Sequence, residues 1–333
     1  MTKTIRIGTR DSELALWQAK TVEKSLNDLG YKTEIIAVKS QGDIILDKPL
    51  YELGITGIFT KTLDIAMING QVDIAVHSMK DVPTALPQGI VQAAVLERAT
   101  VLDILVHKGN TNFLEKEATI ATGSLRRQAQ WLNKYPNHTV IDLRGNVNTR
   151  MQKLNDNDWN GAVFAAAGIE RLGLTPPLSK GEGAKCFKIK SPYFGGVGEA
   201  LDWMIPAPAQ GAMVVLAMGN DNYTIDAVSQ LNDIETEICT FIERQFLSTL
   251  EGGCTAPIGA LAKYDQEDDT IIFEGNLLSL DGKQKTEIKK IVPIENWKKL
   301  GYHSAQEILN NGGKEIMTEI KQQLKKKNKP LRD

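Results

Sequence analysis

The apolar residues of the first hundred positions follow first a strand period and then a helix period. After a short β-like stretch at residues 5–7, apolar side chains recur at spacings of four, three, four and three, as on one face of a helix. These residues are Ala15, Ala19, Val22, Leu26 and Leu29. Asp11 or Ser12 is the predicted N-cap, and Gly30 the predicted end. A strand at 33–39, a helix at 60–69 and a strand at 72–76 complete a β-α-β-α-β order, which indicates a largely parallel sheet covered by helices.

The same alternation begins again after residue 98 and predicts a second α/β unit over roughly 100–200. Its predicted strands are 104–107, 119–122, 139–143 and 162–166. Ser124 is the predicted cap of a helix between the second and third of them. Residues 175–209 are rich in glycine and proline, so we expect a long loop or insertion rather than regular structure there. A buried strand is expected at 213–218.

The last hundred residues have the pattern of a small α+β domain. An apolar helix face runs over 234–250 and ends at Gly252-Gly253. Alternating strands are predicted within 258–292, with a turn at Asp281-Gly282, and a closing helix at 304–324.

Composition excludes several classes of protein. The 333 residues carry 39 Lys and Arg against 41 Asp and Glu, a net charge of −2, which argues against a surface devoted to nucleic acid. A hydrophobic content of 42% is typical of folded domains and not of disorder. We find no secretion signal and no apolar run of about 20 residues, so we expect a cytoplasmic protein with no membrane partner. Three separated cysteines and four dispersed histidines predict neither disulfides nor a metal site.

Basic residues follow the carboxyl ends of nearly all the predicted α/β strands, where open sheets bind ligands. Segment 124–154 alone has six basic residues against one acidic residue. Arginine suits bidentate binding of carboxylate or phosphate, so a polyanionic small ligand is favoured over a merely solvated basic face. Neither a P-loop nor a dinucleotide-binding motif is present to favour phosphate.

Two further residues have open interpretations at this point. Asp81 follows Lys80 and precedes Pro83, so it is either a salt-bridge or turn residue or an acid/base group that stabilises a cation. Cys254 lies among small residues in LEGGCTAPIG, where a thiol would be accessible for covalent attachment, although an isolated cysteine is more often inert. The inert interpretation fits Cys239 within its apolar helix, and it extends to Cys186.

Several motifs in order resemble the porphobilinogen deaminase (hydroxymethylbilane synthase) family. They are IRIGTRDSELALWQA at 5–19, QGDIILDKPL at 41–50, VDIAVHSMKDVP at 72–83, GSLRRQAQ at 123–130, LRGNVNTR at 143–150, AAAGIERLG at 165–173, QGA at 210–212, LEGGCTAPIG at 250–259 and ILNNGGKEI at 308–316. The resemblance implies a transferase that joins four porphobilinogen molecules head to tail, releases ammonia from each, and frees hydroxymethylbilane by hydrolysis. It makes tetrapyrroles for heme.

The resemblance also implies a fold, a cofactor and a set of site residues. The fold is two α/β domains like those of periplasmic binding proteins, here 1–98 with 211–228 and 99–210, plus a small α+β domain at 229–333. A dipyrromethane cofactor is thioether-linked to the position of Cys254, and the carboxylate of Asp81 is catalytic and contacts pyrrole N–H groups. The other implied cofactor residues are Lys80, Ser124, Arg126, Arg127, Gly145 and Arg150. The implied substrate residues are Arg10, Ser12, Arg144, Arg171 and Gln210.

The chain departs from the family pattern at three places. Thr56 replaces a lysine of the lid loop, Ala209 replaces a glycine before QGA, and 175–209 is long. We still expect an active deaminase, with an altered lid and hinge, acting as a monomer on porphobilinogen without nucleic-acid, membrane or metal partners. The competing hypotheses are a catalytically impaired homologue and a two-domain protein that binds small anions.

Overall fold

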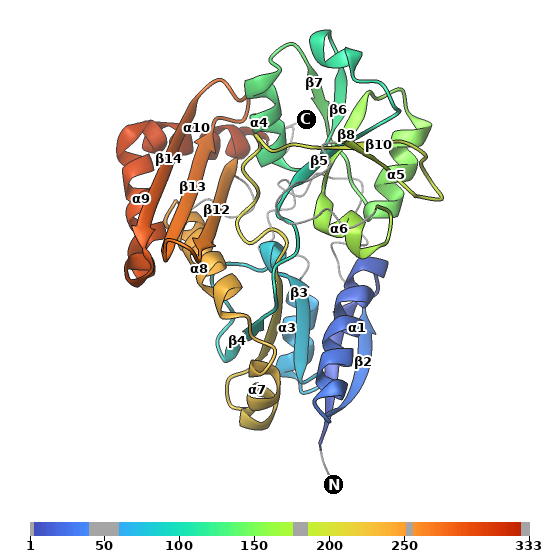
Figure 1. The fold of residues 1–333 in the computed structure, drawn as a ribbon, viewed down its shortest axis with the longest axis vertical. Helices are drawn as coiled ribbons and strands as arrows, with labels where there is room; N and C mark the ends of the chain where they lie inside the picture. The colour runs from blue at the N-terminus through green and yellow to red at the C-terminus, as the bar shows by residue number, and fades with distance from the viewer. Residues whose placement is uncertain (1–2, 40–59, 176–185, 251–255, 328–333) are drawn as a thin grey trace, which may run out of the picture. The chain divides into compact units, whose positions relative to one another are not determined.

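The computed structural model describes residues 3–39, 60–175, 186–250 and 256–327, and these form two compact units (Figure 1). The first unit contains the described residues up to Ala99 together with Ala209–Thr240. The second contains Thr100–Pro208 and the described residues from Phe241 onward. The second unit holds two of the three sheets, so the three-domain boundaries stay a prediction.

The first unit is a five-stranded mixed sheet with helices on both faces. Its elements are β1 (Thr4–Arg10), α1 (Glu13–Asp28), β2 (Lys32–Val38), α3 (Lys61–Ile68), β3 (Ile74–Ser78), a 3₁₀ turn (Met79–Asp81), β4 (Ile90–Val95), β11 (Met213–Met218) and α7 (Asn222–Ser229). The strand order is β2-β1-β3-β11-β4. β1 is parallel to β2 and β3, as the β-α-β-α-β order predicts, whereas β11, which returns later in the chain, is antiparallel to β3 and β4.

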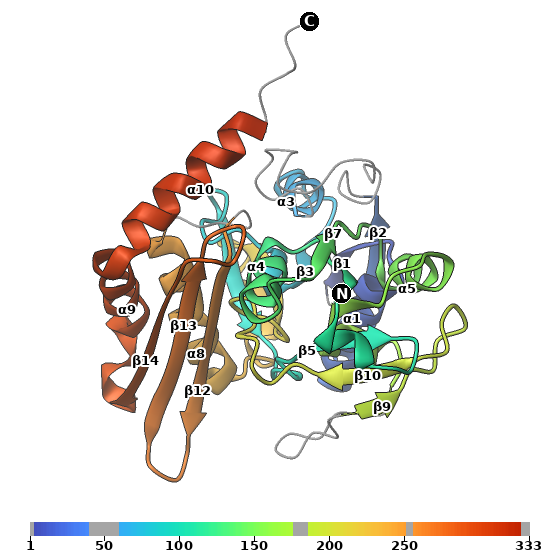
Figure 2. The ribbon, with the colours of Figure 1, turned by 90° about the horizontal axis from the view of Figure 1, so that it is seen from above.

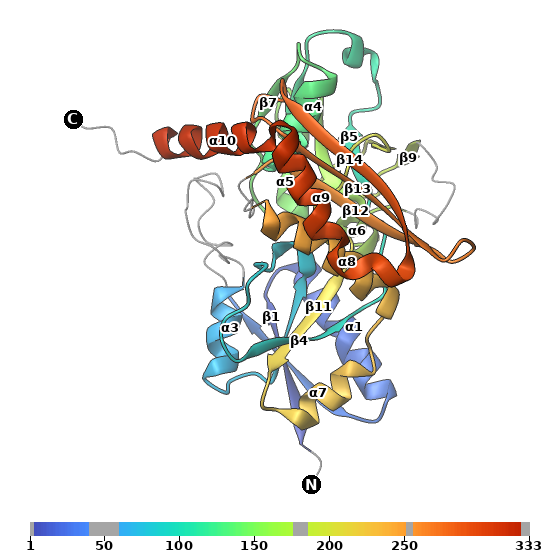
Figure 3. The ribbon, with the colours of Figure 1, turned by 90° about the vertical axis from the view of Figure 1, so that its left-hand side faces the viewer.

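Apolar side chains on the two faces of this sheet form separate cores. Ile5, Ile7 and Val76 face α1 and α7, and Ala75 and Val214 face α3. Figure 3 shows α3 on one side of the sheet and α1 and α7 on the other. Ser12 caps α1, as predicted, by accepting a hydrogen bond from the Ala15 N–H.

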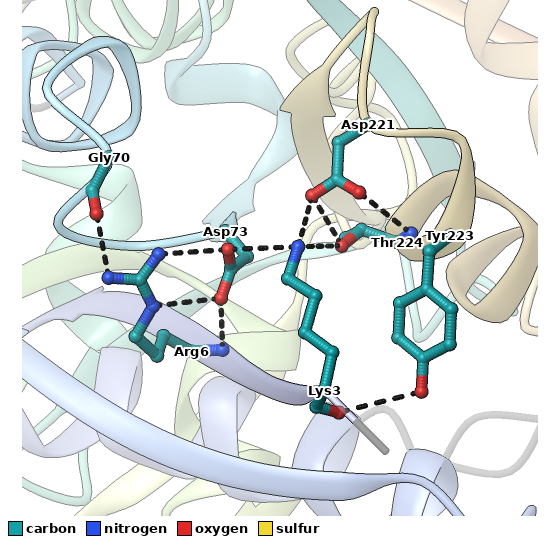
Figure 4. Close-up of polar contacts among 7 residues, drawn as sticks. All are labelled: Lys3, Arg6, Gly70, Asp73, Asp221, Tyr223 and Thr224. Carbon is teal, nitrogen blue, oxygen red and sulfur yellow. Dashed lines mark hydrogen bonds and ion pairs between the residues drawn. The ribbon is translucent and has the colours of Figure 1, made fainter. Parts of the chain in front are cut away.

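A polar network joins the start of the chain to the segment that returns after residue 209 (Figure 4). The Asp73 carboxylate accepts hydrogen bonds from the backbone N–H and guanidinium of Arg6 at 2.8–2.9 Å. Lys3 Nζ lies 3.2 Å from Asp73 and 2.5 Å from Asp221, whose side chain caps α7. This network therefore ties β1 to β3 and to α7.

The second unit contains a six-stranded mixed sheet. Its elements are β5 (Asp103–His107), a 3₁₀ helix (Asn112–Glu115), β6 (Thr119–Ala121), α4 (Leu125–Lys134), β7 (Thr139–Ile141), α5 (Val147–Asp156), β8 (Gly161–Ala165), α6 (Ala166–Arg171), β9 (Cys186–Lys188) and β10 (Val197–Ala200). The strand order is β7-β6-β8-β5-β10-β9. β6 is parallel to β7 and β8, and the other neighbours are antiparallel. Ser124 caps α4, as predicted.

Two strands lie in the segment that was expected to lack regular structure. β10 pairs with β5 from Val197 opposite His107 to Ala200 opposite Ile104, and β9 pairs with β10. Gly198 belongs there because the Phe187 ring lies 2.4 Å from the position of an added Cβ. The loop prediction is therefore wrong for these residues, since pairing with an existing sheet edge outweighs the low strand propensity of glycine.

The second unit also carries a three-stranded antiparallel sheet with helices. Its elements are α8 (Ile234–Thr249, whose first residues lie in the first unit), β12 (Ile258–Asp265), β13 (Thr270–Leu278), β14 (Lys285–Pro293), a 3₁₀ helix (Ile294–Lys299), α9 (Leu300–Ile308), a π-type turn (Leu309–Gly313) and α10 (Lys314–Lys327). Phe246 of α8 packs on Phe273 of β13 with ring centroids 5.2 Å apart. Figure 2 shows the sheet with α8, α9 and α10 around it.

The predicted closing helix at 304–324 is in fact two helices. Asn311 and Gly312 have non-helical backbone angles, and the φ of Gly312 is +94°. The pair Asn311-Gly312 breaks the helix because both residues favour conformations outside the right-handed helical region.

The predicted fold class is confirmed by the three sheets. Two mixed α/β sheets and a separate three-stranded sheet with its own helices are present. Among the described residues, no helix combines the length and apolarity needed to cross a bilayer.

Candidate functional site

In the first unit, the candidate site residues lie where two parallel strands end. β1 ends at Arg10, and Ser12 follows as the N-cap of α1. β3 runs directly into the 3₁₀ turn that contains Lys80 and Asp81. Because β1 and β3 are parallel neighbours, paired Ile7 to Ile74, their carboxyl ends share one edge of the sheet.

Gln210 reaches the same edge by a different route. β11 is antiparallel to β3 and pairs Met213 with Ser78, so it begins where β3 ends. Lys80 Nζ donates to Gln210 Oε1 at 3.2 Å, and Gln210 is only 1% exposed. A search for polar residues after the carboxyl ends of strands does not identify Gln210, because Gln210 precedes the start of β11. In the sequence, only the QGA motif indicated it.

His77 is a buried residue of this edge that the sequence did not indicate. It lies on β3 and is only 4% exposed, and its Nε2 makes no hydrogen bond within the described part of the chain. Burial lowers the pKa of His77 to about 3, with a further lowering from the charge of Arg10. The imidazole is therefore neutral at physiological pH.

In the second unit, two adjacent arginines of α4 share one buried carboxylate. Arg126 Nη1 lies 2.7 Å from Asp103 Oδ2, while Arg127 Nε and Nη2 lie 3.0 and 2.8 Å from Asp103 Oδ1. Arg126 and Arg127 are 4% and 5% exposed, and Asp103 is fully buried. Asp103 was not among the predicted site residues.

The position of Asp103 follows from strand direction. β5 is antiparallel to β8 and pairs Asp103 with Ala165, the last residue of β8. The start of β5 therefore lies at the edge where parallel β6 and β8 end, which is where α4 begins. The sequence signal for Asp103 is a charged residue at the start of a predicted strand, which lies at the site edge when that strand is antiparallel.

The arginine pair has the chemistry to bind carboxylates. Arg126 shares its carboxylate partner with Arg127, and its buried Nε–H donates to no acceptor in the described residues. A buried guanidinium is stabilised by an anion that accepts its remaining N–H groups. This donor set fits a ligand that carries carboxylate groups.

A second group of cations lies after β7, around the start of α5. Arg144 is 5% exposed, and burial lowers its pKa, although nearby Asp142 opposes this. Arg150 Nε donates to the Gly145 carbonyl at 2.8 Å. The φ of Gly145 is +116°, and a Cβ there would lie 2.7 Å from Thr149 Cγ2, so the turn requires glycine.

Arg171 is the last residue of α6, which follows β8 directly. Burial lowers the pKa of Arg171 to about 10, against the opposing charge of Glu170. That value is still well above neutral pH, so Arg171 remains a partly buried cation.

The predicted site residues thus divide between the two units. Arg10, Ser12, Lys80, Asp81 and Gln210 belong to the first unit. Ser124, Arg126, Arg127, Arg144, Gly145, Arg150 and Arg171 belong to the second. Within the described ranges, no group of three His, Cys, Asp or Glu side chains is arranged to hold a metal ion.

The cysteines and the lid residue have three different outcomes. Cys239 is buried, as expected for an inert small side chain. Cys186 is exposed on β9, so it does not pack as a small hydrophobe, and its inertness stays a prediction. Cys254 and Thr56 lie outside the described residues, and the predictions for them stay predictions.

Comparison with known proteins gives matches along almost the whole chain. Residues 5–226 match the family model described as porphobilinogen deaminase, dipyromethane cofactor binding domain, and residues 237–310 match the porphobilinogen deaminase C-terminal domain. A porphobilinogen deaminase of a Nitratiruptor species is 37% identical over 94% of this chain and 96% of its own. One from Desulfitobacterium hafniense is 38% identical over 97% of this chain and 99% of its own.

Similarity to solved structures is more distant. The chain is similar to a Bordetella pertussis BvgS VFT2 domain, with 9% identity, 68% and 86% coverage of the two chains, and a TM-score of 0.39. A periplasmic substrate-binding protein from Coxiella burnetii has 14% identity, 68% and 91% coverage, and a TM-score of 0.37. At these TM-scores the fold class rests on the three sheets themselves. The matches to both family models, in order, and the curated relatives that align over nearly their full length show that the chain belongs to the porphobilinogen deaminase family.

Proposed function

We propose that the protein is an active hydroxymethylbilane synthase. Each condensation breaks the aminomethyl C–N bond of one porphobilinogen, forms a C–C bond between two pyrrole rings, and releases ammonia. After four substrates are joined, water releases the linear product. Membership of the family and the nearly full-length relatives support this transferase activity.

We further propose that a dipyrromethane cofactor is attached through a thioether to Cys254. When bound, this group supplies the pyrrole carbon to which the first substrate is joined. Matching of residues 5–226 to a cofactor-binding domain supports the identity of the group. The residues that would hold its carboxylates and rings are Lys80, Asp81, Ser124, Arg126, Arg127, Gly145 and Arg150.

The buried arginine pair is the observation that carries this proposal. Arg126 shares Asp103 with Arg127 and has a buried N–H without an acceptor in the described chain, which suits a carboxylate ligand. Asp103 is fully buried, so it fixes both guanidiniums before any ligand arrives. Preorganised cations bind carboxylates without an added cost of ordering long side chains.

The remaining residues would act on the incoming substrate. Arg10, Ser12, Arg144, Arg171 and Gln210 would bind the acetate and propionate groups of porphobilinogen and of the growing chain. Asp81, half-buried beside Lys80, would place a negative charge next to the ring that becomes electron-poor when ammonia leaves. The same carboxylate would accept the proton that the newly joined ring must lose.

The experiment is an intact-mass measurement followed by an activity assay. The purified protein should carry the added mass of two pyrrole units, and a Cys254→Ser variant should lack it. Cys186→Ser is the matched control, because Cys186 is an exposed cysteine on β9. Incubation with porphobilinogen should yield hydroxymethylbilane, detected after its cyclisation to uroporphyrin.

The outcomes separate the competing hypotheses. A protein that only binds small anions would weigh what its sequence predicts. A catalytically impaired homologue would carry the added mass without forming tetrapyrrole. Both alternatives are disfavoured by the family matches.

A further inference from the structure

A short backbone segment, residues 205–206, connects the arginine-bearing helix to the strand that follows Cys254 in the chain. Gln130 of α4 is 5% exposed and bonds to both sides of Ile205: its Nε2 donates to the Ile205 carbonyl, and its Oε1 accepts from the Ile205 N–H, each at 2.9 Å. Arg126 Nη1 donates to the same carbonyl at 2.8 Å. The backbone at Ile205 is therefore held by two residues of α4, one of which is a proposed cofactor residue.

The other side of this segment is held by β12. The Ala260 N–H donates to the Pro206 carbonyl at 3.0 Å. Gly259 packs so closely that an added Cβ would lie 2.9 Å from the Ile205 carbonyl oxygen and 2.6 Å from Asn276 Oδ1. β12 begins at Ile258, four positions after Cys254 in the sequence. Residues 205–206 thus contact both α4 and the first residues of β12.

We propose that Gln130 is a positioning residue that fixes the start of β12 relative to Arg126 and Arg127. This inference rests on the proposed function, in which a group tethered to Cys254 must place its carboxylates on those arginines. A tether attached four positions before β12 in the sequence and anions bound on α4 are best matched if β12 and α4 keep a fixed separation. The Gln130 amide supplies that constraint, because it satisfies both backbone polar groups of the half-buried Ile205.

The test compares three single substitutions on α4. Gln130→Met keeps an unbranched side chain of similar length and removes both hydrogen bonds to Ile205. Gln128→Met is the matched control: the same substitution two positions earlier, where the glutamine side chain makes no hydrogen bond with the described residues. Asn133→Ala controls for general docking, because Asn133 Nδ2 donates to the Gly282 carbonyl, in the turn between β13 and β14, at 2.8 Å and makes no hydrogen bond to residues 205–206.

Three measurements distinguish positioning from general stability. In Gln130→Met, hydrogen exchange at the Ala260 amide should rise about tenfold, because the acceptor segment is released on one side. The fraction of chains carrying the two added pyrrole units should fall. In the loaded fraction, kcat should fall severalfold while KM changes less than about twofold, since Arg10 and Ser12 are untouched.

The controls should load cofactor and turn over like the wild type. The inference is overturned if Gln130→Met loads and turns over like Gln128→Met, whatever happens to amide exchange, or if Asn133→Ala causes the same losses. If Gln130→Met does not fold, Gly259→Ala perturbs the same junction from β12 and should give the same pattern of losses. A wild-type protein without the added mass would instead refute the proposed function.

Discussion

Replacement of Asp103 by asparagine tests whether the arginine pair depends on one buried charge. Asp103 is fully buried and lies 2.7–3.0 Å from nitrogens of Arg126 and Arg127. The asparagine would keep the shape of the side chain but would leave two buried guanidiniums facing a neutral amide. Breaking a buried ion pair by removing one partner costs about 3–5 kcal/mol.

That loss would be a large part of the stability of this unit, because single domains are stable by only about 5–15 kcal/mol. Urea unfolding followed by circular dichroism measures it, with an unchanged slope showing that the unfolding reaction is the same. Asp158→Asn is the control, since Asp158 is an exposed carboxylate of the same unit and should change stability by less than about 0.5 kcal/mol.

A double variant shows where the energy comes from. Asp103→Asn combined with Arg127→Met removes one cation together with the anion, so it should lose about 1–3 kcal/mol less than the two single losses added together. The reasoning is refuted if Asp103→Asn costs less than about 1 kcal/mol, or if the losses simply add. Either result would mean that the guanidiniums are held by something other than Asp103.

Three further predictions concern the first unit. Burial alone would raise the pKa of Asp73, but hydrogen bonds from Arg6 and Lys3 outweigh burial and lower the pKa below its ordinary value of 3.8. The ionised carboxylate therefore stabilises the fold fully above pH 3.8, and this stabilisation is lost as the pH falls through the lowered pKa. Asp73→Asn should therefore cost about 1–2 kcal/mol in urea unfolding at pH 7, and the gap to the wild type should close in acid; a gap independent of pH would contradict this. Ala209 has a φ of +61°, so Ala209→Gly should raise the free energy of unfolding by up to about 1 kcal/mol, measured by thermal unfolding. The control Ala217→Gly, on β11, should lower the free energy of unfolding by about 1 kcal/mol. Equal losses in the two variants would show that the backbone at 209 is not strained. Asp81→Ala should fold and keep its cofactor by intact mass yet lose nearly all tetrapyrrole formation, and normal turnover would remove Asp81 from the mechanism.

Hydrophobic periodicity predicted most elements because each buries an apolar face. The strand over 213–218 and the helix that begins at Ile234 are seen at the expected positions. Periodicity did not predict the elements whose structure depends on contacts with distant parts of the chain or on the backbone conformation of a glycine. Residues 197–200 form a strand only because β5 offers an open edge, and the helix expected at 304–324 is interrupted where Gly312 adopts a left-handed conformation.

Strand direction explains what the sequence could not reveal about the site. A strand's residues do not show whether it pairs parallel or antiparallel, so the sequence does not reveal that β5 and β11 run opposite to the parallel strands beside them. Both strands are antiparallel and begin at the edge where the parallel strands end. The residues near their starts, Asp103 and Gln210, therefore join Arg126, Arg127 and Lys80. Only the contacts in the folded chain reveal these partners.

The central place of β11 has a consequence for the order in which the chain folds. β11 lies between β3 and β4, yet it is made more than a hundred residues later, after the whole 100–208 segment. During synthesis, β3 and β4 therefore emerge with a missing neighbour between them, and their unpaired backbone groups are open to other chains. The sheet closes only when residue 218 has left the ribosome, and Asp221 can then reach Lys3. A ribosome-bound chain that ends before residue 213 should accordingly have β3 and β4 sensitive to protease, and a chain long enough for residue 224 to have left the ribosome should protect them.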